Sequence, residues 1–462
     1  MAMTGSPRRL WLKVSSTSVA ANTTAAAKRD AYLKHLLTQA AAAAAASGLG
    51  LSELRERAIA LVNERSFPSG KDEEWRFTEL SDLLALPLSS AKSPASSALS
   101  GALKSNLPLL ENTYRLASVN GYYMSGLSDR LPSLPEGVIV APLSELINHP
   151  KHGQPVREIV SSRLAQVPGS GEVFTALNTA GFSDVMVVWL RADQVLDAPI
   201  HIARDAVGEA ISHLRTLVIA EHHASCTLVE SFWGDDDQAR CNNSVTEFWL
   251  EAGARIDHIR LQDEGAETFH IAKTAVSQAA DSHYQCTSID LGAKLSRHHL
   301  EVYQTGPQTS THLYGLSALS STQLADTHSL IALTHPHSQA DQVQKNVVDE
   351  RSHSVFNGKV YVSRAAQFTN AAQLNRNLIL SNQARVDTKP ELDIVADNVK
   401  CAHGATVSQL QADEVFYLQS RGISAEQAQR LLLYGFAMEI IEKISVEALR
   451  LSLSDRLSKW AG

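Results

Sequence analysis

The stretch that decides the fold is His328-Ser-Leu-Ile-Ala-Leu-Thr334, in the second half of the 462-residue chain. Leu330 and Ala332 alternate along it with Ile331 and Leu333. A period of two places successive side chains on opposite faces of an extended chain, so it is typical of a β-strand and not of a helix. The sequence therefore predicts a strand at this position.

Short runs of the same kind lie on both sides of this stretch. They are rich in Val, Ile, Leu, Thr and Phe, and turn residues such as Gly306-Pro307 separate them. Such strands can form a sandwich, a barrel or a parallel β-helix. About a dozen strands favour a stacked solenoid, although no clean repeat motif is visible. The other runs are 185–190, 215–220, 226–232, 245–250, 256–261, 268–275, 284–291, 298–303, 311–318, 356–362 and 376–380.

Helical signals flank the strand-rich region. Residues 30–39, followed by the alanines of 40–46, predict a first helix, and Ser52 is expected to cap a second one. Residues 88–101, rich in Ser and Ala, are typical of a linker or a long loop. Near the end, Ser424-Ala-Glu-Gln427 is a capping box that predicts the start of a further helix.

These patterns divide the chain into four expected parts. The fold class is mainly β, with helical regions before and after the strands. The parts are a poorly ordered tail with an Ala-rich helix (1–50), an N-terminal helical or mixed domain (51–182), the β core (183–406) and a C-terminal helical domain (407–462).

Composition excludes several classes of protein. The net charge of −8 argues against nucleic-acid binding, which requires a basic face. No stretch approaches the ~20 consecutive apolar residues of a membrane span. Four widely spaced cysteines form no CxxC pair, which points to a reducing compartment. No phosphate-binding GxxxxGK[ST] motif is present, so the chain is not expected to hydrolyse ATP alone.

The N-terminal segment leaves two interpretations open. Residues 1–29 contain no Asp or Glu, carry five basic residues and are rich in Ser, Thr and Ala. That composition is typical of an organellar transit segment, and a disordered bacterial tail is the alternative. The expected location is therefore the chloroplast or plastid stroma, or else the bacterial cytoplasm.

The sharpest chemical feature is Cys401-Ala-His403. In an extended chain, residues two apart face the same way, so a thiol and an imidazole would project side by side. Iron, zinc and iron–sulfur clusters accept these ligands. Two ligands cannot complete a tetrahedral site, so the others must come from elsewhere in the chain or from a partner. Simple packing of the two side chains is the alternative.

Other polar and sulfur-containing residues favour structural roles. Eight of the 18 histidines lie between residues 281 and 360, and we expect solvated or hydrogen-bonded strand positions for them. Cys226, Cys241 and Cys286 are expected in the core. The remaining expectation is a solvated strand edge, formed by the carboxylates of Asp387, Glu391, Asp393 and Asp397.

Four segments resemble the SufB/SufD family of iron–sulfur cluster assembly proteins. They are residues 384–406, 375–378, 416–423 and, near the start, Lys71-Asp-Glu-Glu-Trp-Arg-Phe-Thr78. The resemblance covers about residues 52–450 and is most specific over 375–423. The Trp75 motif and Cys401-Ala-His403 are closer to the SufD branch. No cysteine could be assigned to the cluster-ligand position of SufB.

The resemblance implies a right-handed parallel β-helix flanked by helical regions, and a non-catalytic scaffold within a complex. It implies pairing with a SufB-like subunit through the β-helix ends and docking of a SufC-like ATPase on the C-terminal helices. His403 would be an iron or cluster ligand at the SufB interface, and Cys401 a second functional position. The isolated chain would bind no cluster. The ATPase surface would include Ser424, Leu431, Leu432, Phe436 and Ile440.

The same resemblance suggests a mechanism. ATP-driven dimerisation of the ATPase would move the C-terminal helices, shear the interface between the two sister subunits and expose Cys401 and His403 to iron and sulfur. The resemblance thus implies that this subunit contributes to iron entry. Two alternatives stay open. One is a structural β-helix homodimer without a metal role, and the other is a carbohydrate-active β-helix enzyme, which would require a secretory signal that the sequence lacks.

Overall fold

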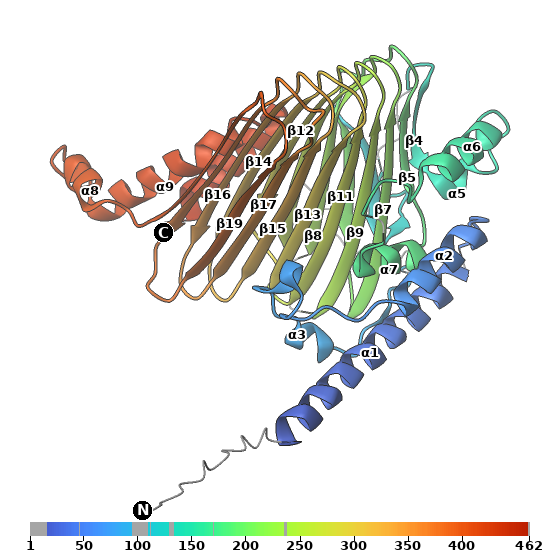
Figure 1. Cartoon of the computed structure of the whole chain (residues 1–462), viewed down its shortest axis with the longest axis horizontal. Coiled ribbons are helices and arrows are strands. Elements are labelled where there is room, and N and C mark those ends of the chain that lie inside the picture. Colours follow the sequence, from blue (N-terminus) through green and yellow to red (C-terminus); the bar gives the residue numbers. More distant parts are fainter. Residues whose placement is uncertain are drawn as a thin grey trace, which may run out of the picture.

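The computed structural model describes residues 16–45, 47–94, 110, 112–128, 134–169, 171–234 and 238–460. Its centre is a parallel β-helix, in which strands alternate between two ten-stranded sheets, and helices lie at both ends of the chain (Figure 1). The expected mainly β fold with a parallel β-helix core is therefore confirmed. Within the described residues, no helix has both the length and the apolar character to cross a bilayer.

The first sheet follows the order β19-β17-β15-β13-β11-β9-β7-β5-β4, with the short β1 beside β7. All its pairs are parallel except β4 with β5. Its strands are β1 (Ser89–Ser90), β4 (Val138–Pro142), β5 (Met186–Leu190), β7 (Ala210–Ala220), β9 (Arg240–Leu250), β11 (Thr268–Gln278), β13 (Leu295–Gln304), β15 (Leu324–Leu333), β17 (His353–Val362) and β19 (Arg385–Ile394).

The second sheet follows the order β20-β18-β16-β14-β12-β10-β8-β6-β2-β3. Only β2 and β3 pair antiparallel. Its strands are β2 (Tyr114–Val119), β3 (Tyr122–Tyr123), β6 (Ile200–Asp205), β8 (Ser225–Gly234), β10 (Arg255–Glu264), β12 (His283–Asp290), β14 (Ser310–Leu319), β16 (Gln339–Val348), β18 (Asn370–Ile379) and β20 (Lys400–Ser408).

One corner of the β-helix carries a left-handed residue in turn after turn. These residues have φ between +58° and +71° and recur every 27 to 31 positions. The N–H of His337, for example, donates to the carbonyl of Gln367 in the next turn at 2.9 Å. Each such residue therefore bends the chain and links consecutive turns. They are Asp193, His223, Gly253, Asp281, Gln308, His337 and Phe368.

The N-terminal helices cover the outer face of the first sheet: α1, α2, α3 and α7 lie at the lower right in Figure 1, and α5 and α6 at the upper right. Helix α1 begins at Ser16, earlier than predicted, and α2 begins at Ser52. The expected Ser52 cap is wrong, because Leu51 occupies the N-cap and makes no side-chain bond. The helical elements here are α1 (Ser16–Ala45), α2 (Ser52–Asn63), η1 (Glu73–Trp75), α3 (Ser81–Leu84), α5 (Leu143–Leu146), α6 (Gly153–Arg163) and α7 (Val173–Gly181).

Part of the predicted linker at 88–101 forms β1, whose Ser89 and Ser90 extend the first sheet beside β7. Residues 95–101 of that linker lie outside the described residues, as does the start of the predicted tail.

The C-terminal helices are α8 (Ala412–Gln419), α9 (Ala425–Ile441) and α10 (Glu447–Trp460). The capping box that opens α9 is confirmed. The Ser424 hydroxyl accepts a hydrogen bond from the backbone N–H of Gln427, and the Gln427 side-chain oxygen accepts one from the backbone N–H of Ser424. Ile440, Ile441 and Leu453 pack with apolar residues of β10, β12 and β14. This packing fixes α9 and α10 on the outer face of the second sheet.

The two ends of the β-helix differ. At the N-terminal end, the inward side chains Leu116, Val138 and Val140 are all buried. At the C-terminal end, β19 and β20 are the last strands of their sheets, and no residue of β19 or β20 is fully buried. The described part of the chain thus closes the first end of the stack and leaves the second open.

Candidate functional site at the open end of the β-helix

Cys401 and His403 lie on β20, the last strand of the second sheet. Their register partners on β18 are Ala371 and Gln373, both of which are buried. Because strands in register carry their side chains on the same face, Cys401 and His403 continue two columns of the β-helix interior. The sequence prediction that the two side chains share one face agrees with this register.

The two side chains differ in their exposure. Cys401 is half-buried and packs against the apolar cluster of the β-helix interior, whereas His403 is exposed. Burial raises the pKa of the Cys401 thiol. An incoming cation would counteract this effect, because a bound metal stabilises the thiolate. The pair therefore offers one exposed nitrogen ligand beside a thiol at the rim of the core.

The pair does not make a complete metal site. Among the described residues, no group of three or more His, Cys, Asp and Glu side chains is arranged to hold a metal ion. Cys401 and His403 therefore supply at most two ligands, and a chemical group from outside the described chain must supply the others. Their role as ligands stays a prediction.

The carboxylates of β19 lie on the edge strand, as expected, and they are paired. Lys359 Nζ lies 2.9 Å from a Glu391 oxygen and 3.2 Å from an Asp393 oxygen. His353 Nε2 lies 2.8 Å from Asp387 Oδ2. Because these pairs link β17 to β19, they hold the last strand of the first sheet in register.

The histidines between 281 and 360 have local partners. His298 shares a 2.9 Å hydrogen bond with Thr274, and His335 one of the same length with Thr334. His337 stacks on Phe368 with ring centroids 5.0 Å apart. The expectation of hydrogen-bonded strand histidines holds for His298, and it holds likewise for His299, His312, His328 and His353, each of which has a polar or charged partner.

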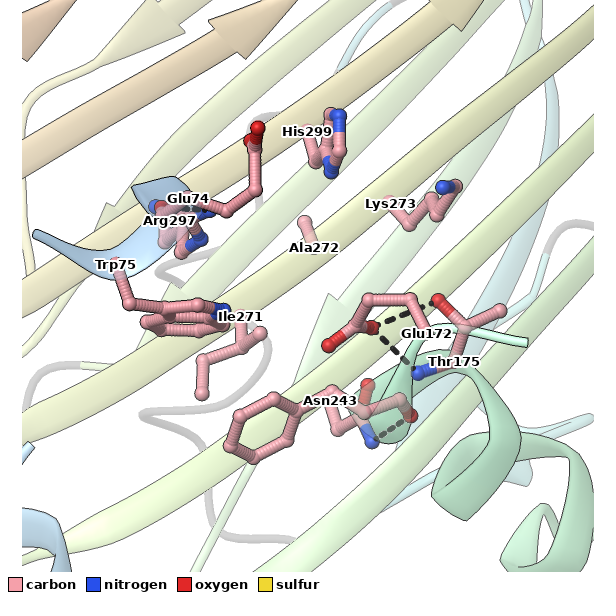
Figure 2. Close-up of a pocket in the computed structure, with 11 residues that line it drawn as sticks. Glu74, Trp75, Glu172, Thr175, Asn243, Ile271, Ala272, Lys273, Arg297 and His299 are labelled. Atoms are coloured by element: carbon pink, nitrogen blue, oxygen red, sulfur yellow. Dashed lines mark hydrogen bonds between the residues drawn. The ribbon is translucent and has the colours of Figure 1, made fainter. Parts of the chain in front are cut away.

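A second candidate site lies under the N-terminal motif. A cavity of about 50 Å³, room for one or two waters, lies between η1, α7 and the outer face of the first sheet (Figure 2). Trp75 lies on one side, where the Arg297 guanidinium stacks 3.9 Å from its ring centroid. Glu172 lies on another side and accepts hydrogen bonds from Thr175.

Ion pairs around this cavity hold the motif in place. His328 bridges Glu74 at 3.1 Å and Asp326 at 2.9 Å. Arg297 pairs with Asp326 and donates to the Glu74 carbonyl at 2.7 Å. Burial opposes the charged form of His328, but Asp326 and Glu74 together outweigh burial and raise the pKa of His328. These contacts explain the Lys71–Thr78 motif as a clamp between the N-terminal region and the β-helix.

Sequence reasoning missed a buried ionic network inside the β-helix. Glu230 lies 3.3 Å from His258 and 3.8 Å from Arg204. Its two oxygens accept hydrogen bonds from Thr216 and Thr246, both at 2.8 Å. These residues are at most 2% exposed, and they come from five strands. No local motif marks them, because only the stacking of turns brings them together.

The three cysteines that were expected in the core are found there. Cys226, Cys241 and Cys286 are all buried, as predicted. The Cys286 sulfur lies 3.7 Å from Nδ1 of His258, which also shares a 2.9 Å hydrogen bond with Tyr284. Burial raises the pKa of both Cys226 and Cys241 to about 12, so these thiols stay protonated and inert.

The residues predicted to contact an ATPase have different exposures. Leu431 is 50% exposed, and Leu432 and Phe436 are half-buried. Ile440 is fully buried against the second sheet, so its prediction as a surface residue is wrong for this conformation. The helical pattern that singled it out marks the inner face of α9. Sequence reasoning also missed Phe416 and Tyr417 of α8, which are 71% and 56% exposed.

The core and the N-terminal region each match a known protein family. A family model described as SUF system FeS cluster assembly, SufBD core domain, matches residues 201–436. A second, described as SufBD protein N-terminal region, matches residues 26–202. The chain belongs to the SufBD family. This confirms the resemblance inferred from the sequence.

Relatives from bacteria and plants support the assignment. An iron–sulfur cluster assembly SufBD family protein of Synechocystis is 41% identical over 86% of this chain and 88% of its own length. The chloroplastic protein ABCI7 of Arabidopsis thaliana is 33% identical over 95% of this chain and 92% of its own length. The iron–sulfur cluster assembly protein SufD of Escherichia coli is 27% identical over 90% of this chain and 94% of its own length. As a SufBD family member, the chain is an iron–sulfur cluster assembly protein.

Proposed function

We propose that this SufBD family protein is the SufD-like scaffold subunit of a complex with a SufB-like subunit and a SufC-like ATPase, and that it has no catalytic activity of its own. The open end of the β-helix carries the proposal. The unpaired backbone groups of an edge strand can pair with a strand of another chain, and a solenoid requires a cap at each end. A sister β-helix that pairs with β19 and β20 would supply the missing strands and the missing cap.

Cys401 and His403 would lie inside this interface. There they would offer a sulfur and a nitrogen ligand to iron or to a transient iron–sulfur cluster, and the sister subunit would provide the remaining ligands. The isolated chain would bind no cluster, because it offers at most this pair. Iron would enter the complex at this interface. The half-buried thiol supports the proposal, since a partner that covers the open end would exclude water from the site.

The ATPase would dock on the exposed side of α8 and α9. Phe416, Tyr417 and Leu431 form the apolar part of this surface, and Ser424 and Leu432 adjoin it. Lys345, from β16, donates to the Phe436 carbonyl at 2.9 Å and pairs with Glu439. Motion of α9 would therefore be transmitted to β16, two strands from β20 in the second sheet. This supports a mechanism in which the ATPase shears the interface and exposes the ligands.

The test is cluster assembly by the reconstituted three-protein complex. We expect His403→Ala to reduce cluster formation strongly, with Cys401→Ala as a second arm. The matched control is His223→Ala, because the His223 side chain is 70% exposed and lies near the other end of the stack. Complex size by native mass spectrometry verifies assembly of each variant. Unchanged cluster formation by His403→Ala in an intact complex refutes the ligand role.

Mass measurement of the chain alone and with partners separates this proposal from a homodimer. A stable homodimer that does not exchange with the SufB-like subunit favours the structural alternative. We also propose a plastid location, supported by the chloroplastic Arabidopsis relative. Import of a fluorescent protein fused to residues 1–50 into isolated chloroplasts tests it, and failure of import favours the bacterial alternative.

A further inference from the structure

A column of amide side chains runs through the β-helix interior toward His403. Gln342 on β16 is in register with Gln373 on β18, and Gln373 is in register with His403 on β20. Gln342 and Gln373 are 3% and 2% exposed. Stacked amides on parallel strands form hydrogen-bonded ladders, and here the histidine takes the position of the next amide.

The hydrogen bond between the two amides of this column has a defined direction. Gln373 Nε2 donates to Gln342 Oε1 at 2.9 Å, so the Gln373 nitrogen is turned toward β16, one turn earlier. Gln342 in turn exchanges hydrogen bonds with the Ser329 hydroxyl of β15, at 2.8 and 3.1 Å. The oxygen of Gln373 is left on the side of β20, and it has no hydrogen-bond partner among the described residues.

Gly358 leaves the space that the Gln373 amide occupies. This residue of β17 faces the interior, and a Cβ there would lie 2.4 Å from Nε2 and 3.0 Å from Cδ of Gln373. The amide therefore lies directly against the glycine backbone. A buried acceptor without a partner costs about 1–3 kcal/mol. The next position in register belongs to His403, whose ring carries an N–H that is suited to donate to Oε1.

The neighbouring column lacks this feature. It runs from Gln344 through Asn375 to Ala405. Asn375 Oδ1 accepts from Asn377 at 2.6 Å and from Thr388 at 2.8 Å, so its acceptor is saturated. Since Ala405 has no polar atom in its side chain, this column offers nothing to a ligand. The unpartnered acceptor is specific to the column that ends in His403.

We propose that Gln373 is a positioning residue for His403. Its Oε1 accepts a hydrogen bond from one ring N–H of His403, which selects one neutral tautomer and orients the imidazole. The other ring nitrogen then presents its lone pair toward the open end, where iron or a cluster would bind. Histidines that ligate metals commonly donate their second N–H to such a fixed acceptor. That His403 binds iron or a cluster rests on the proposed function. The hydrogen bond between Gln373 and His403 does not depend on it.

The first experiment measures the His403 tautomer in the isolated chain. Two-bond ¹H–¹⁵N spectra of ¹⁵N-histidine-labelled protein, with His403→Ala for assignment, distinguish the two neutral forms at alkaline pH. We expect one tautomer in the wild type and an averaged pair of ring nitrogen shifts in Gln373→Met. Gln373→Glu retains an acceptor oxygen and should restore the single tautomer.

Gln344→Met is the matched control, because Gln344 is equally buried, at 3%, but its column ends at Ala405. It should destabilise the fold to a similar extent and leave the His403 tautomer unchanged. Thermal melts verify that each variant is folded. Two results overturn the proposal: a single His403 tautomer in folded Gln373→Met, or an averaged one in the wild type.

The second experiment uses the reconstituted complex. Loss of one orienting partner typically lowers metal affinity about 10- to 100-fold. We expect a loss of that size in Gln373→Met, with recovery in Gln373→Glu. If the tautomer depends on Gln373 but cluster formation is independent of His403, the proposed function fails while the positioning contact stands. If cluster formation requires His403 but its tautomer is the same with and without Gln373, the positioning contact fails while the proposed function stands.

Discussion

Removal of the charge on His258 tests the buried network inside the β-helix. Burial alone would lower the pKa of His258, but the Cys286 sulfur and the Glu230 carboxylate outweigh burial and raise that pKa from 6.5 to about 9. A base with a raised pKa in the folded state stabilises the fold fully below its unfolded pKa of 6.5. That contribution is lost as the pH rises toward 9.

The size of the effect follows from the shift. A shift from 6.5 to about 9 corresponds to about 3 kcal/mol, at about 1.4 kcal/mol for each pKa unit. We therefore expect the free energy of unfolding to fall by roughly this amount between pH 6.5 and 9. The scan ends at pH 9 because Cys226 and Cys241, whose pKa burial raises to about 12, add their own destabilisation above it.

Urea denaturation followed by tryptophan fluorescence measures this dependence. His258→Gln should be less stable than the wild type at pH 6.5 and nearly flat up to pH 9. His201→Gln is the control, because burial lowers the pKa of His201 to about 3 and the side chain is uncharged across the whole scan. Equal losses of stability between pH 6.5 and 9 in the wild type and in His258→Gln refute the reasoning.

Four further predictions concern packing and one ion pair. Gly315→Ala places a Cβ against the Gln344 amide and should cost about 1–3 kcal/mol, whereas Gly435→Ala on α9 meets no atom within 4 Å and should raise the melting temperature. Trp75→Ala should cost about 3–5 kcal/mol and accelerate hydrogen exchange over residues 71–78; unchanged exchange contradicts the clamp. Lys345→Met removes the ion pair with Glu439 on α9, so a protease should cleave the chain around α9 faster than in the wild type. Cleavage at the wild-type rate would contradict the idea that this ion pair holds α9 in place.

Much of the β-helix could be predicted from alternation in the sequence, but some strands could not. The strand at Ile200–Asp205 was missed because the buried His201 and Arg204 interrupt the apolar pattern. Strands β2 and β4 lie among helices in the sequence, and they add to the sheets only through pairing with β6 and β5. Distant pairing is not encoded in local periodicity.

The repeat itself was invisible for a conformational reason. The corner positions with positive φ hold Asp, His, Gly, Gln and Phe, so one backbone geometry recurs without a recurring residue. Neighbouring turns fix this geometry through their hydrogen bonds, and a single glycine satisfies it at Gly253. A search for a repeated residue type therefore finds nothing.

The candidate site could be predicted only in part. The shared face of Cys401 and His403 follows from the period of two. The relation of His403 to Gln373 depends on the register between strands 30 residues apart, which the sequence does not reveal. Ile440 was predicted to contact a partner but is buried. An apolar stripe on a helix can mark the face that packs on the core as well as a face that binds a partner, and the sequence alone does not distinguish the two.

The unequal ends of the β-helix limit how many molecules can join in a row. A stack that accepted neighbours at both ends would polymerise without limit, in the manner of a fibre. Among the described residues, Leu116, Val138 and Val140 already occupy the interior of the first turn, so an added β-helix would find an open core only at the other end. On the proposed function, the fold would thus favour a pair: two β-helices that met at their last turns would each present a filled first turn to a third molecule.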